Sequence, residues 1–166
     1  MGVAGPVNFL KRSGPWLLDL GVIRDEGREG GLVSTDEREA VRASVLTDIS
    51  NAMVRLYKET FGRGPTAARS YWCGENLLTV VLQDTLTPAE RNLVALGEHH
   101  RLRETRMFFQ YATIREFCAP VEQITGRKVR SFLSGTDSEV DGLSIEAFVL
   151  HPAGYDGPSR VDLVAA

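Results

Sequence analysis

The chain has 166 residues, of which 43% are hydrophobic and 25% are charged, a balance that excludes collagen-like and wholly disordered proteins. Its 19 Lys and Arg against 22 Asp and Glu give a net charge of -3, which excludes a dedicated nucleic-acid binder and a polybasic membrane binder. The length predicts one main domain.

The cysteines and the apolar runs indicate the compartment. Cys73 and Cys118 lie far apart and form no CxxC motif, so they predict neither a disulfide framework nor a zinc site. A reducing, cytoplasmic compartment fits this usage. No apolar run approaches the roughly 20 residues of a membrane-spanning helix, and no secretory signal peptide is evident. We therefore expect no direct membrane insertion.

The chain is expected to consist of one domain between two tails. Residues 1–35 contain repeated glycines and two prolines that interrupt every candidate helix, so they are predicted to form a flexible N-terminal arm. Two interpretations of this arm stay open: a cluster around Trp16 packs on the domain, or the arm docks a partner. Residues 36–150 are predicted to form the single domain, and residues 151–166 a C-terminal tail.

The first predicted element is a long amphipathic helix. Ser34 or Thr35 can cap its start, and carboxylates in the next turn favour the helix dipole. Gly62 is a natural C-terminal stop, and Pro65 prevents the helix from resuming. Its apolar residues keep a helical period: Val41, Val45, Ile49, Ala52, Met53, Leu56, Tyr57 and Phe61.

A β-hairpin and a second long helix are predicted next. Residues 66–73 alternate and residues 77–83 are rich in Leu, Val and Thr, with a turn between them. The segment Thr87 to Glu90 is a capping box with proline at the first helical position. Apolar or contact positions then recur as far as Ile124, which predicts one helix that Pro120 kinks or splits near its end.

The last predicted strands are residues 128–133 and 143–150, joined by a turn-forming stretch. Residues 58–65 and 121–128 both end a helix with an apolar residue, glycine and arginine before a hairpin. This similarity suggests that one αββ unit was duplicated. The alternative is that the two segments share only the same helix-capping chemistry. The predicted fold is α+β: two αββ units form a four-stranded antiparallel sheet with two long helices packed on one face.

The stretch from Glu98 to Arg106 carries the most reactive side chains. On a helix His100 and Glu104 share a face, but adjacent His99 and His100 diverge, so two ligands at most could meet and we predict no metal site. The arginines suit carboxylate, bicarbonate or phosphate recognition. The candidate anion-binding residues are Arg103, Arg106 and His99. A structural salt bridge or dimer contact of Arg106 is the alternative.

Other motifs predict no chemistry. The Gly62 to Pro65 segment follows a helix and precedes a strand, which is the reverse of a phosphate-binding loop. No GxSxG motif occurs, and Cys118 lies on an apolar stripe, where cysteine is usually a core residue. Tyr71 and Trp72 lack a basic surrounding, so nucleic acid is not an expected partner. We predict no catalytic residue and no cofactor.

The ordered set of motifs resembles the MpsC family, a component of a proposed Na+-translocating membrane potential-generating system. The likeness covers residues 38–150, and it implies a small soluble bacterial protein linked to a membrane system for ion or inorganic-carbon uptake, with a protein partner from that system. The family offers no catalytic residues to carry over. The motifs that carry it are Tyr57-Lys58-Glu59, Gly62-Arg63-Gly64-Pro65, Leu86-Thr87-Pro88-Ala89-Glu90, Arg106 and Ile124-Thr125-Gly126-Arg127-Lys128-Val129.

Three functional hypotheses follow. The first is a non-enzymatic, cytoplasmic accessory or regulatory protein that forms a homodimer, because the apolar stripe of the second helix outruns the sheet. The second is a sensor of a small anion such as bicarbonate, phosphate or a nucleotide. The third, an enzyme, requires four groups to converge in one pocket. These groups are His99 or His100, Glu104, Cys73 and His151.

Overall fold

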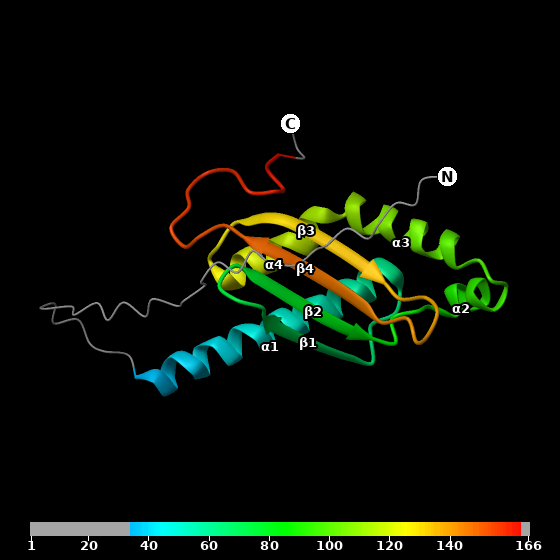
Figure 1. Cartoon of the computed structure of the whole chain (residues 1–166), viewed down its shortest axis with the longest axis horizontal. Helices are drawn as coiled ribbons and strands as arrows, with labels where there is room; N and C mark the ends of the chain where they lie inside the picture. Colours follow the sequence, from blue (N-terminus) through cyan, green and yellow to red (C-terminus); the bar gives the residue numbers. More distant parts are fainter. Residues whose placement is uncertain (1–33, 164–166) are drawn as a thin grey trace, which may run out of the picture. The chain divides into compact units, whose positions relative to one another are not determined.

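The computed structural model describes residues 34–163, so the predicted arm of residues 1–35 lies almost wholly outside the described residues. Within them the fold is α+β, with four helices and one four-stranded antiparallel sheet (Figure 1). The elements are α1 Thr35–Phe61, β1 Ala67–Trp72, β2 Leu77–Gln83, α2 Pro88–Ala95, α3 His99–Ala112, α4 Ile114–Thr125, β3 Val129–Thr136 and β4 Ser144–Leu150.

Helix α1 begins and ends where the sequence predicts. Ser34 caps it in a capping box with Glu37, and Gly62 ends it in the left-handed conformation that glycine adopts without strain. The apolar stripe is buried only in its second half. Ile49 and Met53 are fully buried, whereas Val41 near the start is 60% exposed.

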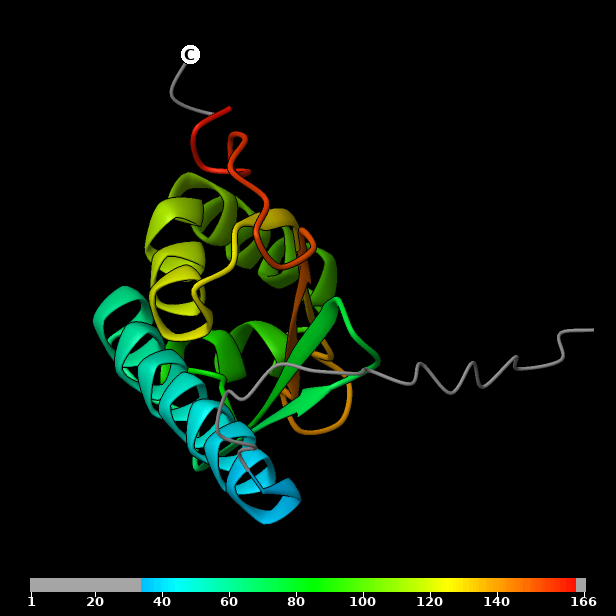
Figure 2. The same ribbon diagram turned by 90° about the vertical axis from the view of Figure 1, so that its left-hand side faces the viewer.

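The sheet has the strand order β1-β2-β4-β3, so the second strand of each hairpin is central. Every neighbouring pair is antiparallel, and Leu78 of β2 lies opposite Phe148 of β4. One face of the sheet packs against α1, α3 and α4, as Figure 2 shows in side view. Alternate strand residues such as Val80, Phe132 and Phe148 fill this face with aromatic and branched side chains. The four-stranded antiparallel sheet is confirmed, and the duplication stays a prediction.

The prediction of one long second helix is wrong, because the segment forms three helices. Gly97 adopts a left-handed conformation and closes α2, with the Glu98 amide donating to the Leu93 carbonyl as in a Schellman motif. Thr113 separates α3 from α4, and its hydroxyl donates to the Phe109 carbonyl. Pro120 lies inside α4, which continues to Thr125, so no last turn is split off at the proline, and the predicted kink stays a prediction.

Strand β3 runs to Thr136, three residues beyond the predicted end, because Ser134 to Thr136 pair with β4. The connecting turn is correspondingly shorter. The turn is joined to the segment after β2 at Gly142, whose carbonyl accepts hydrogen bonds from the Thr85 amide at 3.1 Å and the Thr85 hydroxyl at 2.7 Å. A Cβ at Gly142 would overlap the Leu86 side chain, and its φ of 70° favours glycine.

Residues 151–163 return to the start of β3. The Arg160 amide donates to the Val129 carbonyl at 2.7 Å, and Ser159 is fully buried. Val161 packs against the core. None of the helices in residues 34–163 combines the length and the hydropathy needed to cross a bilayer.

Candidate functional site

A carboxyl group lies in the core of the protein. Glu146 of β4 shares a strand face with Phe148 and Leu150, and the alternation of a strand therefore turns its side chain toward the helices. The residue has no exposed surface. A buried carboxyl is costly unless hydrogen-bond donors or a proton compensate it.

The Glu146 carboxyl is satisfied on one side only. Its Oε1 accepts hydrogen bonds from the Tyr57 hydroxyl, from Gln110 Nε2 at 3.0 Å and from the Ser134 hydroxyl at 3.0 Å. Its Oε2 is buried and has no hydrogen-bond partner among residues 34–163. Burial raises the pKa of Glu146 to about 8, against the opposing effect of these donors and of the Arg106 charge. The group therefore holds its proton at neutral pH.

Arg106 lies beside this carboxyl and is only 1% exposed. Its Nε donates to Glu90 Oε1 at 2.6 Å and its Nη2 to Glu90 Oε2 at 2.7 Å, in a bidentate pair. The same guanidinium donates to the carbonyl and hydroxyl of Thr85 and stacks over Phe61 at 4.3 Å. Burial acts to raise the pKa of Glu90, but the hydrogen bonds from Arg106 and Thr87 and the Arg106 charge together outweigh it and lower this pKa.

A chain of hydroxyl groups extends from Arg106 to the edge strand β3. Thr85 Oγ1 lies 3.0 Å from Ser144 Oγ, which in turn lies 3.0 Å from Thr136 Oγ1. Arg106 donates to the Thr85 hydroxyl at 3.1 Å. A polar layer thus runs between the sheet and α3, and it reaches the edge strand β3 at Thr136.

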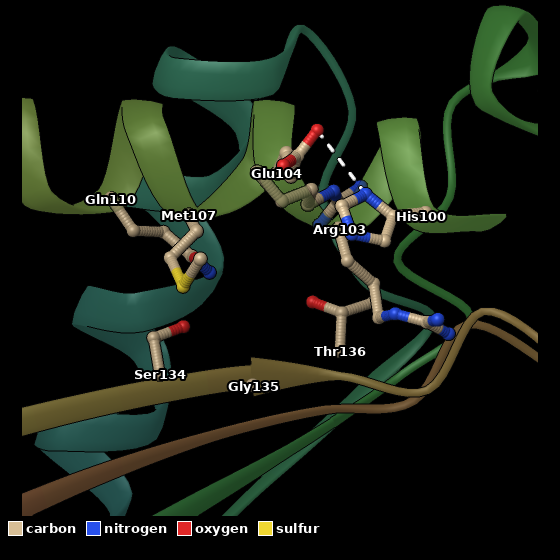
Figure 3. Close-up of a pocket in the computed structure, with 9 residues that line it drawn as sticks. His100, Arg103, Glu104, Met107, Gln110, Ser134, Gly135 and Thr136 are labelled. Atoms are coloured by element: carbon tan, nitrogen blue, oxygen red, sulfur yellow. Dashed lines mark ion pairs between the residues drawn. The ribbon is translucent and has the colours of Figure 1, made fainter. Parts of the chain in front are cut away.

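A cavity of about 330 Å³ opens between α3 and β3, next to this layer. Figure 3 shows Ser134 and Thr136 rising from β3 toward Met107 and Gln110 of α3. Gln110 is 2% exposed, and it and Ser134 both donate to Glu146, so the buried carboxyl lies directly behind the cavity wall. The full lining is His100, Arg103, Glu104, Arg106, Met107, Gln110, Ser134, Gly135 and Thr136.

The three predicted anion-binding residues occupy different places. Arg103 lines the cavity, and its Nη1 donates to Ser138 Oγ at 3.0 Å. Arg106 also lines it but is engaged with Glu90 and Thr85. His99 points elsewhere, with its Nδ1 3.1 Å from the Ser138 carbonyl oxygen. Nothing among residues 34–163 groups three His, Cys, Asp or Glu side chains as a metal site would require.

The side chains that the enzyme hypothesis requires lie in different parts of the structure. His100 and Glu104 form an ion pair 3.2 Å apart at the mouth of the cavity. His151 instead stacks on Tyr155, with ring centroids 3.8 Å apart, and Cys73 lies near Thr79 beyond the end of β1. Neither of these two residues lines the cavity.

Sequence reasoning did not find Glu146, Tyr57, Gln110 and Ser134 as members of a site. One signal was available: Glu146 alternates with Phe148 and Leu150 in a strand, so its side chain had to share their buried face. Gln110 follows Arg106 by one helical turn, so the two side chains share a face of α3, and this spacing could have indicated that both are buried. A polar residue at a core position of an amphipathic pattern is the general signal.

The fold and the cavity can be compared with known proteins. A family model described as "Na+-translocating membrane potential-generating system (MpsC)" matches residues 42–151, which is more than half of the chain. The chain belongs to the MpsC family. No curated protein and no solved structure matches it.

The part that matches the MpsC family contains both the polar layer and the cavity. It begins inside α1 and ends just after β4, so Tyr57, Arg106 and Glu146 all lie within it. The matched region leaves out most of the C-terminal segment that returns to β3.

Proposed function

We propose that this MpsC protein is a non-enzymatic, cytoplasmic accessory protein that acts as a homodimer in a membrane potential-generating system. The link to that system is supported by the description of the family. The homodimer is supported by one observation in the structure, the exposed apolar face of α3.

The apolar face of α3 consists of Met107, Phe108 and Tyr111. Phe108 is 69% exposed, Met107 48% and Tyr111 37%, although each is large and apolar or aromatic. The three residues line one hollow with Glu104 and Ala112. Contiguous apolar surface of this kind is typical of interaction sites, since single exposed apolar residues need no explanation but clusters do.

A second copy fits this face by symmetry. An antiparallel α3 pair with its twofold axis between Phe109 and Gln110 places Phe108 opposite Tyr111 of the second copy and Met107 opposite its Ala112. One patch then buries itself in an isologous contact, the commonest form of homodimer. The antiparallel arrangement also opposes the two helix dipoles.

Sedimentation equilibrium at tens of micromolar tests the dimer. We expect a dimer for the full chain and a monomer for Phe108→Glu, because a carboxylate cannot be buried unpaired at the centre of the contact. Leu133→Glu is the matched control, since Leu133 is 58% exposed on β3, away from α3. A monomeric full chain, or a dimer that only Leu133→Glu dissociates, contradicts the proposed contact.

The role in a membrane potential-generating system has a separate test in cells. Cells lacking the protein are expected to have a reduced membrane potential by dye distribution. The full chain and Leu133→Glu are expected to restore it, while Phe108→Glu is not. An unchanged potential in the deletion strain contradicts the role even if the dimer forms in solution.

A further inference from the structure

The cavity between α3 and β3 has an apolar middle and polar ends. Met107 lies over it, and Gln110, Ser134 and Thr136 supply an amide and two hydroxyls at its inner side (Figure 3). The Gln110 side chain is almost fully buried, and its amide is held in place by the hydrogen bond that it donates to Glu146. Ligand sites commonly combine apolar walls with a few convergent polar groups of this kind.

Among residues 34–163, the accessible arginine at the mouth of the cavity is Arg103. The Arg103 side chain is 45% exposed and lies 3.5 Å from Glu139, whose own side chain is 68% exposed. Solvent screens such an exposed pair. Arg106 is held by the buried Glu90 carboxylate, and the His100 ring lies 3.2 Å from the Glu104 carboxylate.

We propose that this cavity binds a small monocarboxylate with an apolar body, whose carboxylate pairs with Arg103. The planar guanidinium matches a carboxylate through two parallel hydrogen bonds. A single negative charge fits a single accessible cation, whereas phosphate or a nucleotide would bring further charge against Glu104 and Glu139. The proposal goes beyond the dimer and does not depend on it.

The size and walls of the cavity set the rest of the ligand. A volume of about 330 Å³ lies at the lower end of the range for ligand pockets, so the molecule has on the order of ten non-hydrogen atoms. Its apolar body contacts Met107, and a hydroxyl or keto oxygen can meet Ser134 or Gln110. Of the residues first expected at an anion site, Arg103 contacts the ligand. His99 and Arg106 are positioning residues, because His99 approaches the Ser138 carbonyl and Arg106 fixes α3 to Glu90 and Thr85.

Methionine methyl resonances give a local readout of binding. The chain has three methionines, and Met53 is fully buried in the core as an internal reference for the cavity residue Met107. The full-length protein labelled with 13C-methyl methionine is titrated with sodium hexanoate. We expect a saturable shift of the Met107 signal, assigned with Met107→Leu, and an unchanged Met53 signal.

Two matched variants test the carboxylate contact. Arg103→Gln is expected to weaken hexanoate binding at least about tenfold, the loss typical of a charged hydrogen bond. Arg101→Gln makes the same change of charge on the same helix, at a side chain that is 70% exposed and lies 3.7 Å from Glu98. This variant is expected to change binding less than about twofold.

Four results would overturn the proposal: no saturable Met107 shift, equal binding of 1-hexanol and hexanoate, tighter binding of phosphate or bicarbonate than of hexanoate, or equal weakening by the two arginine variants. Met107 also lies on the apolar face of α3, where the proposed dimer would contact it. The titration is therefore carried out at one protein concentration, and a Met107 shift that appears on dilution without hexanoate is assigned to self-association.

Discussion

The Tyr57 hydroxyl donates a hydrogen bond to the Glu146 carboxyl and so joins α1 to the central strand β4. Gln110 and Ser134 converge on the same oxygen, which ties α3 and β3 to it as well. One buried carboxyl thus connects four elements of the fold, and its raised pKa is the basis of the first prediction.

The first prediction concerns the pH dependence of stability. Burial raises the pKa of Glu146 from its ordinary 4.5 to about 8, so between these values the folded protein holds a proton that the unfolded chain has released. Raising the pH through this window therefore favours the unfolded chain, and above about 8 the stabilising proton is lost. We expect the free energy of unfolding to fall by up to about 1.4 kcal/mol per pH unit within the window.

Glu146→Gln isolates this effect. The amide keeps an acceptor for Tyr57, Gln110 and Ser134 but does not titrate. The groups that face Glu146 stay in place: Tyr57 from α1, Arg106 from α3 with Glu90 behind it, and Cys118 from α4. Urea unfolding from pH 5 to pH 9 should show the variant gaining stability relative to the parent as the pH rises. Parallel pH profiles of the two chains would contradict the assignment.

The second prediction concerns the buried ion pair of Arg106 and Glu90. Arg106→Met leaves the Glu90 carboxylate and the Thr85 carbonyl without their donor, and we expect a loss of about 3 kcal/mol in the free energy of unfolding. Arg101→Met, on an exposed turn of the same helix, should change it by less than about 0.5 kcal/mol. Similar losses in both variants would show that Arg106 contributes no more than a surface charge.

The third prediction compares two glycines with nearly equal φ. Gly126→Ala, where a Cβ meets nothing within 4 Å, should cost about 1 kcal/mol for the left-handed backbone alone. Gly142→Ala adds an overlap with Leu86, and it should cost roughly 1–3 kcal/mol more, the usual range for overpacking. Thermal unfolding measures both. In the Gly142→Ala background, Leu86→Ala should restore part of the lost stability. If it restores none, the overlap with Leu86 does not cause the additional loss.

The fourth prediction concerns the two thiols. Cys118 is buried, and burial raises its pKa to about 12, so almost no thiolate forms at neutral pH. Cys73 is exposed. A thiol reagent should modify one cysteine in the native protein and two in urea, and Cys73→Ser should abolish the native reaction. Rapid native modification of Cys118 would mean that α4 opens readily.

Local chemistry made much of the fold predictable. The cap at Ser34, the capping box at Thr87, the stop at Gly62 and the alternation of β1 each act within a few residues, and each is confirmed. The single long second helix was wrong because the apolar period continues across Gly97. Periodicity reports which side faces the core, and it does not report where the backbone turns.

The site was less predictable because it depends on tertiary contacts. The sequence places Arg106 and His99 on one helix, but it does not say that Arg106 meets Glu90 from α2 or that His99 approaches Ser138. Only Arg103 of the expected set reaches the cavity with an exposed cation. The buried Glu146 could have been found by its strand parity, whereas its partners from three other elements could not.

The strand order also bears on how fast the protein folds. Each hairpin pairs strands that are neighbours in sequence, whereas β2 meets β4 only across the whole length of α2, α3, α4 and β3. Closing so long a loop costs conformational entropy before the hydrogen bonds and packing between β2 and β4 can offset it. The β2–β4 ladder is therefore expected to form last. Substitutions that weaken the β2–β4 ladder should then mainly speed unfolding, whereas substitutions in the earlier-forming hairpins should slow folding.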